Sequence, residues 1–179
     1  RQVAAAGRVP VVYEVNLHTT EGAGHAPARN AALQSQGAGV LLARQLLRGS
    51  LAGARYQAVY SLSGHDTQVG NRDDFAPLFG VTRDLASPQP RLRATGQALA
   101  LLNRVAQSSI RPATCAGTGC ESLTVAYFQA NQAVALVSSL DRAQDVLVKL
   151  PCASGSIVTV DTLSGSGQAT ASACEGRQV

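Results

Sequence analysis

The residue whose type and position most clearly suggest chemistry is Glu14. It lies in a short apolar run, Val11-Val12-Tyr13-Glu14-Val15-Asn16-Leu17, which is followed by a polar loop. Alternation along a strand places Glu14 on one face with Val12 and Asn16. The opposite face then carries Val11, Tyr13, Val15 and Leu17. A carboxylate in an apolar strand is costly unless something pairs with it or uses it. Active sites of α/β proteins lie at the carboxyl ends of strands, so the sequence predicts a functional acid here.

A second group of polar residues closes the next predicted strand, in the segment Ser61-Leu62-Ser63-Gly64-His65-Asp66. Ser, His and Asp are the residue types of a nucleophilic triad, but triad members converge from separate places and these are nearly consecutive. The chain also has no Gly-x-Ser-x-Gly elbow. We therefore interpret His65 and Asp66 as contacts to substrate hydroxyls, with a polar turn as the alternative.

The remaining polar residues give weaker signals. His18 follows the Glu14 strand in the loop, where a histidine either binds substrate or is simply exposed, and the same holds more weakly for His25. Asp73 and Asp74 are adjacent acids in a loop, which are expected to be solvated rather than to bind a cation. The sequence predicts no metal site and no organic cofactor.

The four cysteines all fall late in the chain, at Cys115, Cys120, Cys152 and Cys174. Their spacing does not match the short paired spacings of zinc sites, and no histidine lies near them. Two disulfides, Cys115–Cys120 and Cys152–Cys174, are the favoured interpretation, with four buried thiols as the alternative. Disulfides indicate an oxidising compartment, so we expect a secreted or periplasmic protein.

Composition excludes several classes of protein. The net charge is +4 over 179 residues, and Lys149 is the only lysine among the positive charges. The arginines form no block or stripe, which argues against nucleic-acid binding. No apolar run is long enough to span a bilayer, so no membrane partner is expected. The chain contains no Met and opens at Arg1. We therefore expect a processed protein or a piece of a longer one.

The elements that must position these residues change in kind partway along the chain. Strands are predicted at 9–17 and 56–62, and helices at 28–48 and 90–106, because apolar residues recur there at strand or helix spacing. Leu33, Val40, Leu41, Leu46 and Leu47 supply much of the first helix's apolar face. A long connection rich in glycine and proline precedes the second helix.

Beyond residue 109 the helical period disappears. Short segments rich in β-branched residues predict strands at 123–129, 132–139, 145–150 and 156–163, with a weak strand or a frayed end after 165. Such a pattern describes an antiparallel sheet or part of a sandwich. The predicted fold class is thus α/β plus all-β. Residues 1–108 would form the last two β/α units of a TIM barrel, and residues 109–179 an antiparallel β-sandwich. Two parallel strands cannot stand alone, so upstream polypeptide is expected to complete the barrel.

The segment Tyr13-Glu14-Val15-Asn16-Leu17, followed by a polar loop, resembles the seventh barrel strand of retaining glycoside hydrolases with catalytic carboxylates on strands four and seven. Members that act on arabinosides, xylosides and glucuronides also carry a C-terminal β-sandwich. Residues 126–163 are similar in texture to that module, and residues 132–150 resemble its usual aliphatic hairpin.

The resemblance implies that Glu14 is the nucleophile. The acid/base would lie on strand four, in the missing N-terminal part of the same chain, and this chain alone would be inactive. Asn16, His18, His65 and Asp66 would contact an oligosaccharide, polysaccharide or glycoside substrate. A retaining enzyme needs its two carboxyl groups only about 5–5.5 Å apart. The absence of Trp departs from the usual sugar-stacking platforms and leaves Phe75 and Phe79 as the candidates in this chain.

Alternative interpretations remain for the acid and for the whole chain. Glu14 is a structural carboxylate if an arginine pairs with it, and Arg55 and Arg72 are the candidates. The chain is then a non-catalytic, β-rich module for carbohydrate or protein binding. The end of a doubly wound α/β hydrolase is disfavoured by the β-rich second half and by the lack of a nucleophile elbow.

Overall fold

The computed structural model describes residues 6–15, 17, 26–63, 65–68, 75–78, 80–83, 85, 87–106, 109–128, 133–138, 157–160 and 170–173. Helix and strand are mixed, and the strands form several small sheets. The chain divides into two compact units, Arg1–Ala100 and Leu101–Val179. Across the described residues, no helix is both long enough and apolar enough to cross a membrane.

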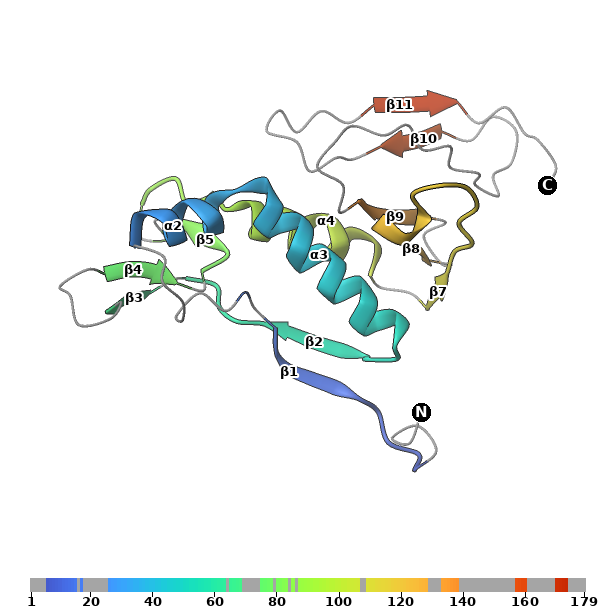
Figure 1. Ribbon diagram of the computed structural model, residues 1–179, viewed down its shortest axis with the longest axis horizontal. Helices are drawn as coiled ribbons and strands as arrows, with labels where there is room; N and C mark the ends of the chain where they lie inside the picture. Colours follow the sequence, from blue (N-terminus) through green and yellow to red (C-terminus); the bar gives the residue numbers. More distant parts are fainter. Residues whose placement is uncertain are drawn as a thin grey trace. The chain divides into compact units, whose positions relative to one another are not determined.

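The first unit begins with a strand, two helices and a second strand. These are β1 (Val11–Val15), α2 (Ala26–Gln34), α3 (Gln36–Leu51) and β2 (Tyr56–Val59). The two strands pair in parallel, and α3 packs against β2 (Figure 1). A parallel pair needs a crossover connection, and the helices provide it. The elements thus follow in the order strand, helix, helix and strand, although β2 ends at Val59 and not at residue 62.

The region predicted as one helix at 28–48 contains two, because the chain breaks at Ser35. Ser35 has extended dihedral angles, and its hydroxyl accepts a hydrogen bond from the Ala38 amide at 3.3 Å. The same hydroxyl donates to the Ala32 carbonyl at 2.7 Å. One serine thus caps the start of α3 and bonds to the last turn of α2, as short hydroxyl side chains do at helix ends.

The core of the first unit lies along α3. Leu42, Leu46 and Leu47 are buried there, and Leu33 of α2 is buried too. The predicted apolar face was partly wrong, because Leu41 is half exposed and its neighbour Leu42 is fully buried. The apolar stripe that faces the core therefore includes Leu42, where the sequence analysis had placed Leu41.

Short strands fill the connection after β2. They are β3 (His65–Gln68), β4 (Phe75–Leu78), β5 (Thr82–Arg83) and β6 (Arg91–Leu92). Strand β3 pairs with β4 and β5 pairs with β6, and both pairs are antiparallel. The helix α4 (Ala94–Val105) follows. It starts later than residue 90, the predicted first residue, because Arg91 and Leu92 pair with β5.

The second unit is built from antiparallel strands. One sheet has the order β7 (Ile110–Pro112), β8 (Leu123–Phe128) and β9 (Ala133–Ser138), and β10 (Ile157–Val160) pairs with β11 (Thr170–Ala173). Strands are thus confirmed within the predicted segments 123–129, 132–139 and 156–163, whereas 145–150 lies outside the described residues. Burial alternates along β8, and Thr124, Ala126 and Phe128 form its buried side.

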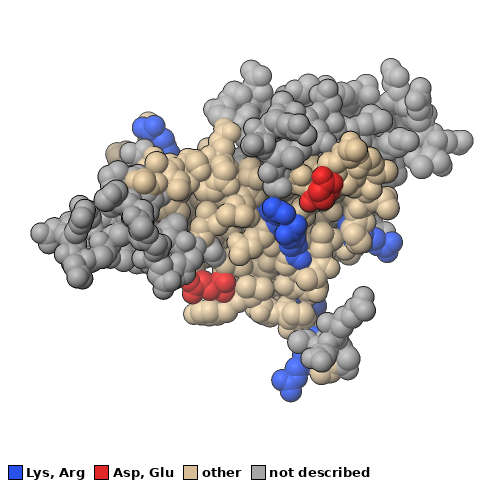
Figure 2. All heavy atoms as spheres, viewed as in Figure 1, with Lys and Arg blue, Asp and Glu red and all other residues tan. Residues whose placement is uncertain are grey.

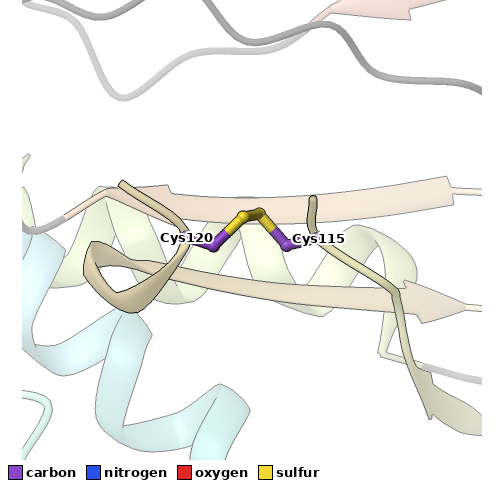
Figure 3. Close-up of a disulfide and its surroundings, with 2 residues drawn as sticks. All are labelled: Cys115 and Cys120. Atoms are coloured by element: carbon purple, nitrogen blue, oxygen red, sulfur yellow. A yellow bond between two sulfur atoms is a disulfide. The ribbon is translucent and has the colours of Figure 1, made fainter. Parts of the chain in front are cut away.

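A disulfide joins Cys115 to Cys120, as predicted, with their Cα atoms 5.7 Å apart (Figure 3). Between them the chain turns through Gly117 and Gly119, whose φ angles of 111° and 92° lie in the region that glycine favours. The one-turn helix η1 (Cys120–Ser122) then leads into β8. The predicted partners Cys152 and Cys174 lie outside the described residues.

Candidate functional site

Glu14 lies next to the last residue of β1, at the carboxyl end of the parallel pair (Figure 1). Its side chain is exposed. At this end of the pair, the Tyr60 amide donates a hydrogen bond to the Val15 carbonyl at 3.2 Å. The chain after each strand therefore leaves from the same edge, which is where ligand sites of parallel α/β structures lie.

An irregularity in the strand pairing surrounds Glu14. Val11 pairs with Tyr56 and Val12 with Gln57, but the next pair is Val15 with Val59. Three steps along β1 thus match two steps along β2, so β1 contains one extra residue. Such β-bulges increase the local twist and are common beside active sites, where they redirect a side chain.

The bulge corrects the predicted distribution of side chains between the two faces. Gln57 and Val59 are two residues apart on β2, so their partners Val12 and Val15 lie on the same side of the pair. Val15 is only 5% exposed. Simple alternation predicted that Val15 and Val12 lie on different faces. This prediction was wrong, because alternation does not allow for an extra residue in the strand. Tyr13 and Glu14 lie within the bulge, and both are exposed.

No ion pair between Glu14 and Arg55 is found in the part of the chain that the structure describes. The Arg55 guanidinium instead lies over the Tyr56 ring, 5.8 Å from its centre. The Arg55 amide donates to the Pro10 carbonyl, so Arg55 lies at the opposite end of the strand pair. Four residues of extended chain separate Pro10 from Glu14, roughly 13 Å. The other candidate partner, Arg72, lies outside the described residues.

The side of the pair away from α3 carries large exposed side chains. Gln57 bonds to α3, so its neighbours along β2 point the other way. Tyr56 and its partner Val11 are both well exposed on that side, and Tyr60 is 44% exposed. Tyr13, in the bulge, is 88% exposed. We refer to Val11, Tyr13, Tyr56 and Tyr60 as the open face.

Tyr60 was not among the predicted site residues, although its amide bonds to the carbonyl of Val15, the residue after Glu14. The signal was present, because Tyr56 and Tyr60 are four residues apart in an extended segment and therefore share a face. The aromatic candidates named from the sequence were Phe75 and Phe79. Phe75 is in β4, but its side chain is not described, and Phe79 lies outside the described residues.

The other predicted contacts are only partly placed. Asn16, His18, His25, Asp73 and Asp74 lie outside the described residues. His65 and Asp66 begin β3 and pair with Leu78 and Pro77 of β4. The turn considered as the alternative for this segment is therefore wrong for His65 and Asp66.

Among the described side chains at the carboxyl end of the strand pair, Glu14 is the acid available for chemistry. Among the described residues no group of three or more His, Cys, Asp or Glu side chains comes together as a metal site. On the face that Figure 2 shows, the described basic and acidic side chains are scattered and form no patch. An exposed carboxylate such as that of Glu14 can act as a nucleophile, or it can accept hydrogen bonds from a hydroxylated ligand.

Comparisons with models of protein families, with curated proteins and with solved structures found no match to this chain.

Proposed function

We propose that this chain is the C-terminal part of a retaining glycoside hydrolase and that Glu14 is its nucleophile. Residues 1–108 would contribute the last two β/α units of a (β/α)8 barrel. Residues 109–179 would be an appended β-sandwich that stabilises the barrel. The substrate would be an oligosaccharide, a polysaccharide or another glycoside.

One observation supports this proposal most strongly. Glu14 is exposed at the carboxyl end of a parallel strand pair, in a bulge that keeps it out of the α3-covered side. A structural acid would gain from a nearby cation, and Arg55 does not supply one. An acid that must reach substrate has to remain accessible, as Glu14 does.

The proposed reaction has two steps. A Glu14 carboxylate oxygen forms a bond to the anomeric carbon as the bond to the leaving oxygen breaks, and a second carboxylic acid protonates that oxygen. Water then attacks the anomeric carbon, the second residue takes the water proton, and the Glu14 carboxylate is released. That second residue would come from upstream polypeptide, so the present chain would not complete either step alone.

Other residues have supporting roles in this proposal. The exposed ring of Tyr60, next to the bulge, would contact a sugar ring, because aromatic side chains combine a large apolar surface with a polar tip. Asn16, His18, His65 and Asp66 remain proposed contacts to sugar hydroxyls. The Cys115–Cys120 disulfide supports a proposed secreted or periplasmic location, since such bonds persist in oxidising compartments.

The proposal is tested by replacing Glu14 with Gln in the protein expressed from its complete reading frame. Glu14→Gln keeps the shape of the side chain and removes its nucleophilic oxygen. We expect kcat on an activated aryl glycoside to fall roughly a thousandfold or more, with an unchanged melting temperature. The matched control is Glu121→Gln, an exposed acid of the second unit, which should leave kcat unaltered.

Two results would contradict the proposal. An active enzyme that tolerates Glu14→Gln has its nucleophile elsewhere. A protein that hydrolyses no glycoside of a broad panel, and that loses stability in Glu14→Gln, contains a structural acid in a non-catalytic binding module.

A further inference from the structure

We propose that Gln57 is a positioning residue for Glu14, because it fixes β2 on α3 and thereby holds the bulge that presents the carboxylate. This inference rests on the proposed function of Glu14. Gln57 itself does not reach the open face, since its side chain points toward α3.

The side chain of Gln57 attaches β2 to the helix α3. Its Nε2 atom donates to the Leu46 carbonyl at 2.8 Å and to the Ser50 hydroxyl at 2.9 Å. Both acceptors lie in the last turns of α3. The helix surface is shaped for this contact, because a Cβ atom added to Gly49 would lie 2.1 Å from the Gln57 Oε1 atom. The amide is half buried, so an unmade hydrogen bond there is costly.

Gln57 also lies next to the bulge in the strand pair. Gln57 pairs with Val12, and this is the last regular pair before the extra residue of β1. On the far side of the bulge, Val15 pairs with Val59 and accepts the Tyr60 amide. The bulge is therefore held between two fixed points, and Gln57 ties the first of them to α3.

The hydrogen bonds of Gln57 to α3 help to select the register between β1 and β2. A one-residue slip in pairing turns every later side chain to the other face. If all residues of β1 paired regularly with β2, without a bulge, Glu14 would lie on the same side as Val12 and would face α3. The present register instead sends Val15 to the α3 side and leaves Glu14 exposed. Loosening β2 on α3 removes part of what selects this register.

The test compares kinetics in the protein expressed from its complete reading frame. Gln57→Leu has nearly the same size and loses both hydrogen bonds, whereas Ser50→Ala loses only one. The control for stability is Leu33→Ala, which removes a buried side chain of α2 outside this contact. Glu14→Gln is measured in the same series, so that the nucleophile assignment is tested separately.

We expect Gln57→Leu to lower kcat roughly 10- to 100-fold with little change in KM, because small displacements of a reacting group have effects of this size. Ser50→Ala should lower kcat less. Leu33→Ala should lower the melting temperature but leave kcat nearly unchanged. If Gln57→Leu does not fold, the kcat of Ser50→Ala is compared with that of Leu33→Ala instead.

The inference is overturned if Gln57→Leu and Ser50→Ala lose no more activity than Leu33→Ala while Glu14→Gln is inactive. In that case Glu14 is the nucleophile and Gln57 serves stability alone. If Glu14→Gln keeps its activity, the proposed function fails first and the positioning role fails with it.

Discussion

The strands β1 and β8 differ in how regularly exposed and buried side chains alternate along them. Along β8, half-exposed and buried residues alternate without interruption from Leu123 to Phe128. Along β1 the alternation breaks between Val12 and Val15, where two consecutive residues are exposed. The β8 pairings with β9 are continuous, whereas β1 carries an extra residue against β2. Alternation therefore predicts faces only where the pairing is regular.

The difference between β1 and β8 has a physical reason, because β1 contains a charged residue and β8 does not. In β1, regular pairing would turn the Glu14 carboxylate toward α3, and burying an unpaired charge there is costly. The bulge removes that conflict and buries Val15 in its place. In β8 no charged residue lies between Leu123 and Phe128, so no such conflict arises.

Deleting one residue from each strand should give the largest contrast. Removing Val125 from β8 would turn one end of the strand over and exchange its buried and half-exposed sides. We expect loss of a cooperative unfolding transition for the second unit. Removing Tyr13 from β1 would instead leave regular pairing, with Val15 still opposite Val59 on the α3 side. That deletion should lower the melting temperature by less than about 3 °C, or roughly 1 kcal/mol for a chain of this size.

Calorimetry of both deletions measures this contrast, and hydrogen exchange assigns each transition to a unit. If the Tyr13 deletion unfolds the first unit, then Tyr13 is not the dispensable residue of the bulge. If the Val125 deletion is harmless, β8 is not held by its buried side.

Replacing one aromatic residue in each strand should give a smaller contrast of the same kind. Phe128 is 4% exposed at the end of β8. Phe128→Ala is expected to lower the free energy of unfolding by about 3–5 kcal/mol. Tyr13 is exposed in the bulge, so Tyr13→Ala should change it by less than about 0.5 kcal/mol. Chemical denaturation of both variants checks the difference, and equal losses would mean that the open face of β1 is covered in solution.

Much of the local structure could be predicted from the sequence, because it depends on nearby residues. The strand around Glu14, most of the apolar residues of α3 and the strands β8, β9 and β10 follow from spacing, whereas β7 was not predicted. The break at Ser35 was missed, since one hydroxyl that bonds on both sides leaves the apolar period almost unchanged. The strand β6 was missed because Arg91 and Leu92 are extended only through pairing with β5.

The candidate site was predicted less completely. Glu14 was proposed because of its apolar surroundings, and the disulfide between Cys115 and Cys120 was predicted because the cysteine spacing does not match a zinc site. The exposure of Glu14 depends on the register between β1 and β2 and on the contact of Gln57 with α3. The register and the contact of Gln57 are tertiary features, which cannot be predicted from alternation within one strand.

The most direct test of the central claim is covalent trapping of the nucleophile. The protein expressed from its complete reading frame would be incubated with 2-deoxy-2-fluoro glycosides that carry good leaving groups, then digested and analysed by tandem mass spectrometry. A retaining enzyme accumulates its glycosyl-enzyme intermediate under these conditions, and our account predicts the sugar on Glu14. A sugar attached to any other carboxylate would show that Glu14 is not the nucleophile.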